Sequence, residues 1–224
     1  MSKVCYSCGV PLKKNVNRSK EHVPAKNLFD GFEKPLTKNI VTVPACTTCN
    51  GGYSHIDQNL RDLLAIKNND PNSKVEFTRK GATSIVVHSD WKERVTMDNA
   101  GNVTAVSFGE RDLWLYHIKN FKALFFDKYG TPIPGDFQID AITKYSEEHA
   151  GMFYTFFNHA PDIAEWQVSG HEDVFKYILH EVSLSQHGGI SSLVGLFVYH
   201  GDIRVLVIAC RNADIAAMNS HYRH

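Results

Sequence analysis

The sequence contains no long hydrophobic run, since no apolar stretch reaches the roughly 18 residues that a membrane-spanning helix requires. The segment MSKVCYSCG has a lysine but no apolar stretch after it, so we expect no secretory signal peptide. The sequence therefore predicts a cytoplasmic protein with no membrane partner. In a reducing compartment, cysteines serve as metal ligands more often than they form disulfides.

The sequence also lacks net charge, because 24 Lys and Arg balance 24 Asp and Glu. This balance hides an asymmetry along the chain. Residues 1–50 hold eight basic and three acidic side chains (8 − 3 = +5), so the remainder holds 16 basic and 21 acidic ones (16 − 21 = −5). A basic segment joined to a mildly acidic body indicates a polyanionic partner for the first segment only. Chance clustering of solvated lysines is the alternative.

The overall composition is that of a soluble globular protein, with 43% hydrophobic and 21% charged residues in a chain of 224. The polar cluster at 68–73 marks the best boundary between two units. We therefore predict an α+β protein with a small metal-organised module at 1–68 and a larger α+β domain at 73–224.

Hydrophobic spacing predicts the elements of both units. Helices are expected at 56–67, 110–129, 137–149 and 171–183. Strands are expected at 75–79, 83–89, 93–97, 103–108 and 152–157, with a turn at 98–102. Two apolar runs within 193–210, around His200-Gly201-Asp202, are typical of a hairpin in a buried sheet.

Two C-x-x-C pairs provide the strongest chemical signal, and they consist of Cys5 with Cys8 and Cys46 with Cys49. Each pair can form a tight turn that directs two thiolates at one ion, and two such turns complete a tetrahedral zinc site. Four cysteines leave zinc no open position, so we expect this zinc to be structural. Cys210 ends an apolar strand and is expected to be a core residue.

Between and after these pairs stand Glu21-His22-Val23-Pro24, then Asn39-Ile40-Val41, and finally Asn50 directly after Cys49. In this order the sequence resembles the zinc-containing branch of the HNH nucleases, which are also called His-Me finger or ββα-metal nucleases. The resemblance covers about a quarter of the chain. We recognise no known family in residues 70–224.

The resemblance implies a role for each matching residue. His22 corresponds to the general base that activates water. Glu21, usually Asp in this family, and Asn50 correspond to ligands of a catalytic divalent cation. Asn39 corresponds to the residue that steadies the loop and orients the histidine. The resemblance also implies a setting in bacterial or phage restriction or defence.

Elementary chemistry agrees with these roles. A neutral imidazole can accept a proton from water near pH 7, and a carboxylate with an amide oxygen suits Mg²⁺ or Mn²⁺. Lys20, Lys26 and Lys38 flank the motif and are expected to contact phosphates of DNA, with RNA as an alternative substrate. Residues 73–224 would then supply specificity, regulation or homodimerisation. The alternative is a non-catalytic zinc-knuckle module that binds nucleic acid or protein.

Overall fold

A computed structural model describes residues 3–30, 38–67, 83, 95–100, 103–106, 110–143, 150–184, 190–201 and 203–213. It is a mixed α+β structure, as predicted, and it begins with two strands and a helix beside the four cysteines. The helices are α1 (Thr47–Lys67), α4 (Glu110–Tyr129), α5 (Ala150–Asn158) and α6 (Ala160–Ile163), with a 3-10 helix η1 (Lys26–Phe29). None of the helices in these described ranges is both long and apolar enough to cross a membrane.

The N-terminal unit consists of β1 (Arg18–Val23), β2 (Val41–Cys46) and α1. The two strands pair in antiparallel register, with Glu21 opposite Val43 and His22 opposite Thr42. Side chains of β1 alternate between the two faces of this pair, so that Glu21 and Val23 are buried while Lys20 is exposed. Because neighbouring residues on a strand point in opposite directions, Glu21 and Val23 belong to the buried face of β1, and Lys20 belongs to its exposed face.

A second sheet holds five antiparallel strands in the order β5-β9-β8-β7-β6. These strands are β5 (Phe137–Thr143), β6 (Gln167–Val168), β7 (Phe175–Leu184), β8 (Ile190–Tyr199) and β9 (Ile203–Arg211). A separate hairpin is formed by β3 (Val95–Met97) and β4 (Val103–Val106). The predicted hairpins on either side of residues 98–102 and of His200-Gly201 are confirmed, and both His200 and Gly201 have positive φ.

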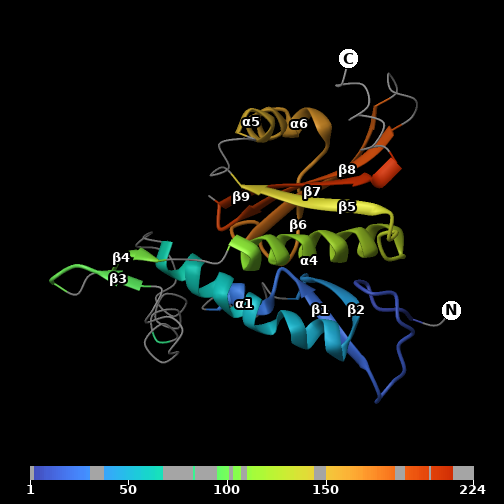
Figure 1. The fold of residues 1–224 in the computed structure, drawn as a ribbon, viewed down its shortest axis with the longest axis horizontal. Helices are drawn as coiled ribbons and strands as arrows, with labels where there is room; N and C mark the ends of the chain where they lie inside the picture. The colour runs from blue at the N-terminus through green and yellow to red at the C-terminus, as the bar shows by residue number, and fades with distance from the viewer. Residues whose placement is uncertain are drawn as a thin grey trace.

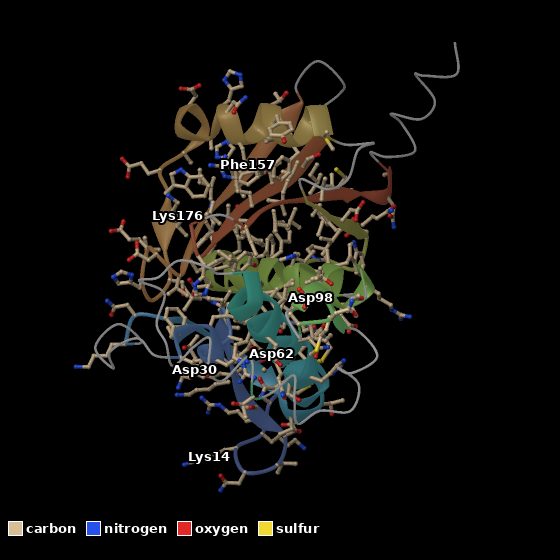
Figure 2. The ribbon with its side chains drawn as sticks, turned by 90° about the vertical axis from the view of Figure 1, so that its left-hand side faces the viewer. Lys14, Asp30, Asp62, Asp98, Phe157 and Lys176 are labelled. Atoms are coloured by element: carbon tan, nitrogen blue, oxygen red, sulfur yellow. The ribbon has the colours of Figure 1, made fainter. Side chains whose placement is uncertain are left out.

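The five-stranded sheet is covered on both faces (Figure 1). Helix α4 lies against one face, between the sheet and the N-terminal unit, and α5 with α6 lies on the other. Alternating residues of β9 show the same division, because Val205 and Val207 join the core around α4 while Leu206 joins the core under α5. In Figure 2, Phe157 points from α5 into this second core.

The core around α4 extends into the N-terminal unit. It combines buried residues of the first cysteine turn, of β1 and β2, of α4 and of the large sheet, among them Tyr6, Val23, Phe121 and Phe197. The predicted boundary at 68–73 lies outside the described residues, as do the predicted strands at 75–79 and, apart from Thr83, at 83–89.

Three predicted elements are wrong. The segment expected as a helix at 137–149 begins with strand β5, and the one expected at 171–183 contains strand β7. The segment expected as a strand at 152–157 lies in helix α5. The helix at 110–129 is confirmed as α4, and the helix expected from residue 56 begins earlier, at Thr47.

Candidate metal centre and the buried site beside it

The four cysteines of the two C-x-x-C pairs come together at one end of the β1-β2 pair. Their Sγ atoms all lie within 4.8 Å of one another, and the Sγ atoms of Cys8 and Cys46 are 3.9 Å apart. Sulfurs at about 2.3 Å from a tetrahedral zinc would be about 3.8 Å apart. The cysteines are thus positioned to bind a metal ion, and the donor set is consistent with structural zinc.

Local turns bring each pair of thiols into place. In the first pair, Gly9 adopts φ +71° and its N–H donates to the carbonyl of Cys5 at 2.9 Å, which folds the chain back after Cys8. In the second pair, Cys46 ends β2 and Cys49 lies in the first turn of α1. The N–H of Cys49 donates to Cys46 Sγ at 3.3 Å, so a helix N-terminus faces that sulfur.

Backbone hydrogen bonds attach the metal centre to the strands. The N–H of Tyr6, within the first turn, donates to the carbonyl of Pro44 in β2 at 2.9 Å. The N–H of Thr47, between the second pair of cysteines, donates to the carbonyl of Asn17 just before β1 at 2.9 Å. Binding of a metal by the cysteines would therefore fix the register of β1, β2 and α1.

Two of the predicted site residues, Glu21 and Asn50, are brought together. Glu21 is 3% exposed on the inner face of β1, and Asn50 follows Cys49 in α1. In the amide orientation that its neighbours satisfy, Asn50 Nδ2 donates to Glu21 Oε2 at 3.1 Å and to the Lys20 carbonyl at 3.2 Å. Its Oδ1 then accepts from Ser19 Oγ at 3.1 Å.

Glu21 also has a cationic partner that the sequence did not indicate. Lys119 of α4 is completely buried, and its Nζ lies 3.2 Å from Glu21 Oε1. The same ammonium group forms an ion pair with Asp57 Oδ1 of α1. Burial raises the pKa of Glu21 and of Asp57, and the charge of Lys119 opposes that rise in both. The three residues form a buried cluster, which we call the Glu21-Lys119-Asp57 cluster.

A buried hydroxyl group completes the surroundings of Glu21. Tyr6 is fully buried, and its hydroxyl has no hydrogen-bond partner among the described residues. Burial raises the pKa of Tyr6, and the nearby charges of Glu21 and Asp57 raise it further. Because buried hydroxyls rarely stay unpaired, the Tyr6 hydroxyl is available for one more hydrogen-bond partner.

The side chain of His22 occupies the face of β1 opposite to that of the buried Glu21. Its backbone N–H donates to Glu21 Oε1 at 3.2 Å, and no hydrogen bond to its imidazole is found within the described residues. Burial lowers the pKa of His22 to about 4, and the positive charges of Lys26, Lys20 and Lys119 act in the same direction. The imidazole is therefore neutral at pH 7.

Asn39 is exposed just before β2, and the structure does not bring its side chain into hydrogen-bonding contact with His22 in the part of the chain it describes. Its backbone carbonyl instead accepts from Gly170 at 3.1 Å. Lys20, Lys26 and Lys38 are all exposed, on β1, at the start of η1 and before β2 respectively. Cys210 lies in β9, away from the metal centre, with its Sγ 3.1 Å from Ser192 Oγ.

Sequence reasoning did not select Lys119, although the sequence contains a weak signal for it. Lys119 and Asn120 interrupt the apolar residues of the helix at 110–129 between Ile118 and Phe121. A charged residue inside an otherwise buried helical stretch needs a partner, but the helix alone cannot indicate that the partner is 98 residues away.

Searches against protein-family models, curated proteins and solved structures found no match to this chain.

Proposed function

We propose that the chain is a metal-dependent endonuclease that hydrolyses phosphodiester bonds of DNA. The proposal rests on one observation. A terminal atom of the Asn50 amide lies 3.1 Å from Glu21 Oε2. Adjacent ligands of an octahedral cation with bonds of about 2.1 Å are about 3 Å apart. If the amide turns its Oδ1 toward Glu21, the two oxygens have the spacing of neighbouring ligands on Mg²⁺ or Mn²⁺.

The surroundings of Glu21 also suit a hydrated cation. The Glu21-Lys119-Asp57 cluster carries two carboxylates and one ammonium, so its formal charge is −1 when all three are ionised. The Tyr6 hydroxyl, which has no hydrogen-bond partner among the described residues, is available to a water molecule. A bound divalent cation would offset negative charge on the phosphoryl group and the leaving oxygen.

His22 is suited to the role of general base. A general base must be unprotonated at the working pH, and the lowered pKa of about 4 keeps the imidazole of His22 neutral there. The same low value makes it a weaker base than an ordinary histidine. Phosphate binding near Lys20 and Lys26 would offset their positive charges and raise the pKa of His22 in part, while the effect of burial, its larger cause, would remain.

The outer face of β1 is suited to a phosphate backbone. Arg18 and Lys20 are exposed and, like His22, occupy alternate positions of the strand, so the three side chains share one face. Glu21 is the only acidic residue of β1 and β2, and it is buried on the opposite face. Earlier in the chain, Lys14 lies at the outer end of the turn before β1 (Figure 2). A polyanion therefore meets only basic or neutral side chains on this face of the strands.

A second candidate function is a zinc-knuckle module that binds nucleic acid without cutting it. It is favoured by the fact that both carboxylate oxygens of Glu21 already have partners in the described structure, Lys119 at Oε1 and Asn50 at Oε2. Such a site is complete without a catalytic cation. The same basic face of β1 would serve this function equally well.

Incubation of supercoiled plasmid and of a fluorescent RNA with Mg²⁺ or Mn²⁺ distinguishes the two functions. We expect metal-dependent nicking or linearisation of DNA by the wild type and its loss in His22→Ala and Glu21→Gln. Lys176→Ala, which changes a lysine of the large sheet, serves as the control. DNA binding of equal strength in all variants, with no cleavage by any, would establish the binding module instead.

A further inference from the structure

We propose that Lys119 is a positioning residue for this cleavage reaction, holding Glu21 Oε1 so that Oε2 faces Asn50 as a cation ligand. The proposal rests on the proposed function. It assigns to the second half of the chain a direct part in shaping the nuclease site, because Lys119 lies 98 residues beyond Glu21 in the sequence.

The burial of Lys119 calls for an explanation. Removing an ammonium group from water costs several kcal/mol, and a well-packed apolar side chain often gives equal or better stability than a buried ion pair. Yet Lys119 is 0% exposed, with two carboxylate partners. Its Nζ also lies 5.0 Å from the ring centre of Tyr116 and 5.8 Å from that of Tyr53. The surroundings are thus arranged to hold a cation at this point.

The two oxygens of Glu21 are used differently. Oε1 accepts from Lys119 Nζ and from the backbone N–H of His22, both at 3.2 Å, whereas the partner of Oε2 among the described residues is the Asn50 amide. Glutamate has one more rotatable bond than the aspartate that is usual at this position, so its carboxylate is harder to orient. Two donors on one oxygen fix the plane of the carboxylate and leave the other oxygen directed at Asn50.

Because Lys119 is paired with Asp57 as well as with Glu21, the cluster keeps a net negative charge that can attract a cation. A lysine paired with Glu21 alone would give a neutral pair with little attraction for Mg²⁺. With Asp57 included, the formal charge is −1 − 1 + 1 = −1, so a divalent cation near Oε2 is still attracted. Lys119 can therefore orient Glu21 without cancelling the negative charge of the site.

Lys119 can affect metal affinity either as a nearby positive charge or by positioning Glu21, and these two explanations predict changes of opposite sign when Lys119 is replaced. If Lys119 acts only as a nearby positive charge, replacing it by methionine removes repulsion and Mn²⁺ binds with equal or greater affinity. If Lys119 positions Glu21, Lys119→Met releases the carboxylate, and the Mn²⁺ Kd rises about tenfold to a hundredfold, as for other partners that orient metal ligands. The sign of the change separates positioning from charge.

The experiment measures Mn²⁺ binding by electron paramagnetic resonance, and plasmid cleavage, on the zinc-loaded protein of residues 1–224. Lys119→Met is compared with the wild type, with Lys119→Arg, and with Lys122→Met three residues along α4. We expect weaker Mn²⁺ binding and a lower kcat for Lys119→Met, a nearly unchanged KM for DNA, partial recovery with Lys119→Arg, and no change for Lys122→Met.

A double variant guards against misfolding and against a change of charge. Lys119→Met with Asp57→Asn removes one charge of each sign and leaves the formal charge at −1. Positioning predicts that this variant still binds Mn²⁺ more weakly than the wild type. An active wild type beside a Lys119→Met or double variant of unchanged Mn²⁺ affinity and kcat would overturn the role of Lys119 alone. A wild type that neither cuts DNA nor binds Mn²⁺ would overturn the proposed function and this inference together.

Discussion

Acidification is expected to destabilise the protein through His117, a residue of α4 that is only 2% exposed. Its Nδ1 lies 3.3 Å from the hydroxyl of Tyr199, and its ring lies 5.6 Å from that of Tyr116 and 5.4 Å from that of Tyr199, measured between centroids. Burial among these aromatic rings lowers the pKa of His117 to about 3. The folded protein therefore keeps this imidazole neutral over a wide range of pH.

The sign of the pH effect follows from the two pKa values. In the unfolded chain the imidazole titrates near its ordinary value of 6.5, well above the folded value of about 3. As the pH falls below 6.5, the unfolded state binds the proton first, so the free energy of unfolding decreases until the pH reaches about 3. Each pH unit in this window corresponds to about 1.4 kcal/mol, so the loss at pH 5 is about 2 kcal/mol. That is a substantial part of the roughly 5–15 kcal/mol that stabilises a typical protein.

Urea unfolding of the wild type and His117→Gln at pH 8 and pH 5 measures this contribution. Other groups that titrate over this range are common to both proteins, so the difference between their pH effects isolates His117. We expect the wild type to lose about 2 kcal/mol more than the variant. Tyr199→Phe is the matched control, since it removes the hydrogen-bond partner but keeps the imidazole and hence the extra loss. Equal losses in the wild type and His117→Gln would refute the reasoning.

Three further predictions concern the metal centre, the packing beside it and the basic face. Cys46→Ser should lose its bound zinc and the folded structure of the N-terminal unit, because structural zinc supplies folding free energy. Zinc analysis and far-UV circular dichroism test this expectation. An unchanged melting curve would contradict it. Gly170→Ala should destabilise by about 1–3 kcal/mol in thermal unfolding, because φ is +80° and a Cβ would lie 2.5 Å from the Phe29 ring. Gly51→Ala, with open space around it, is the control, and equal stability of the two variants would count against this packing argument. Lys20→Ala should weaken DNA binding for all sequences and reduce the slope of log K against log salt by about one; an unchanged slope would remove Lys20 from the interface.

The sequence predicted the elements that have strong local signals. The helix at 110–129 ends at Gly130, which adopts φ +73°, a conformation that glycine tolerates without strain. The hairpin of β8 and β9 was predicted from two apolar runs around His200-Gly201. The doubled C-x-x-C spacing predicted that the four cysteines would meet, because each pair closes within a single turn.

The wrong elements are those whose hydrophobic pattern depends on neighbours far away in the sequence. In β7, Phe175 and Tyr177 pack into the core around α4, while Ile178 packs into the core under α5. A strand covered on both faces lacks the alternation of apolar and polar residues that identifies strands, so the hydrophobic pattern of β7 resembled that of a helix. In α5, Phe153 and Phe157 are one helical turn apart and both face the sheet, although aromatic residues favour strands when considered alone.

The candidate site could be predicted only in part for a related reason. Glu21, His22 and Asn50 lie next to or between the cysteines, so a local motif was enough to select them. Lys119 joins the site only through the packing of α4 against α1 and β1, the two elements that carry its anionic partners. The partners of a buried charge are determined by tertiary packing, which no spacing rule within one helix contains.

Helix α4 is buried on two sides, and this explains how one helix can connect the sheet to the candidate site. Toward the sheet, Phe121 packs so closely on Gly195 that a Cβ there would lie 2.7 Å from its ring. Toward the N-terminal unit, Lys119 reaches Glu21, and Tyr116 Oη accepts from the N–H of Ala25 at 3.4 Å. Because Phe121 and Lys119 are two residues apart on a rigid helix, a shift of α4 against the sheet must also move the ammonium group that holds Glu21. The geometry of the site therefore depends on the contacts that α4 makes with both the sheet and the N-terminal unit.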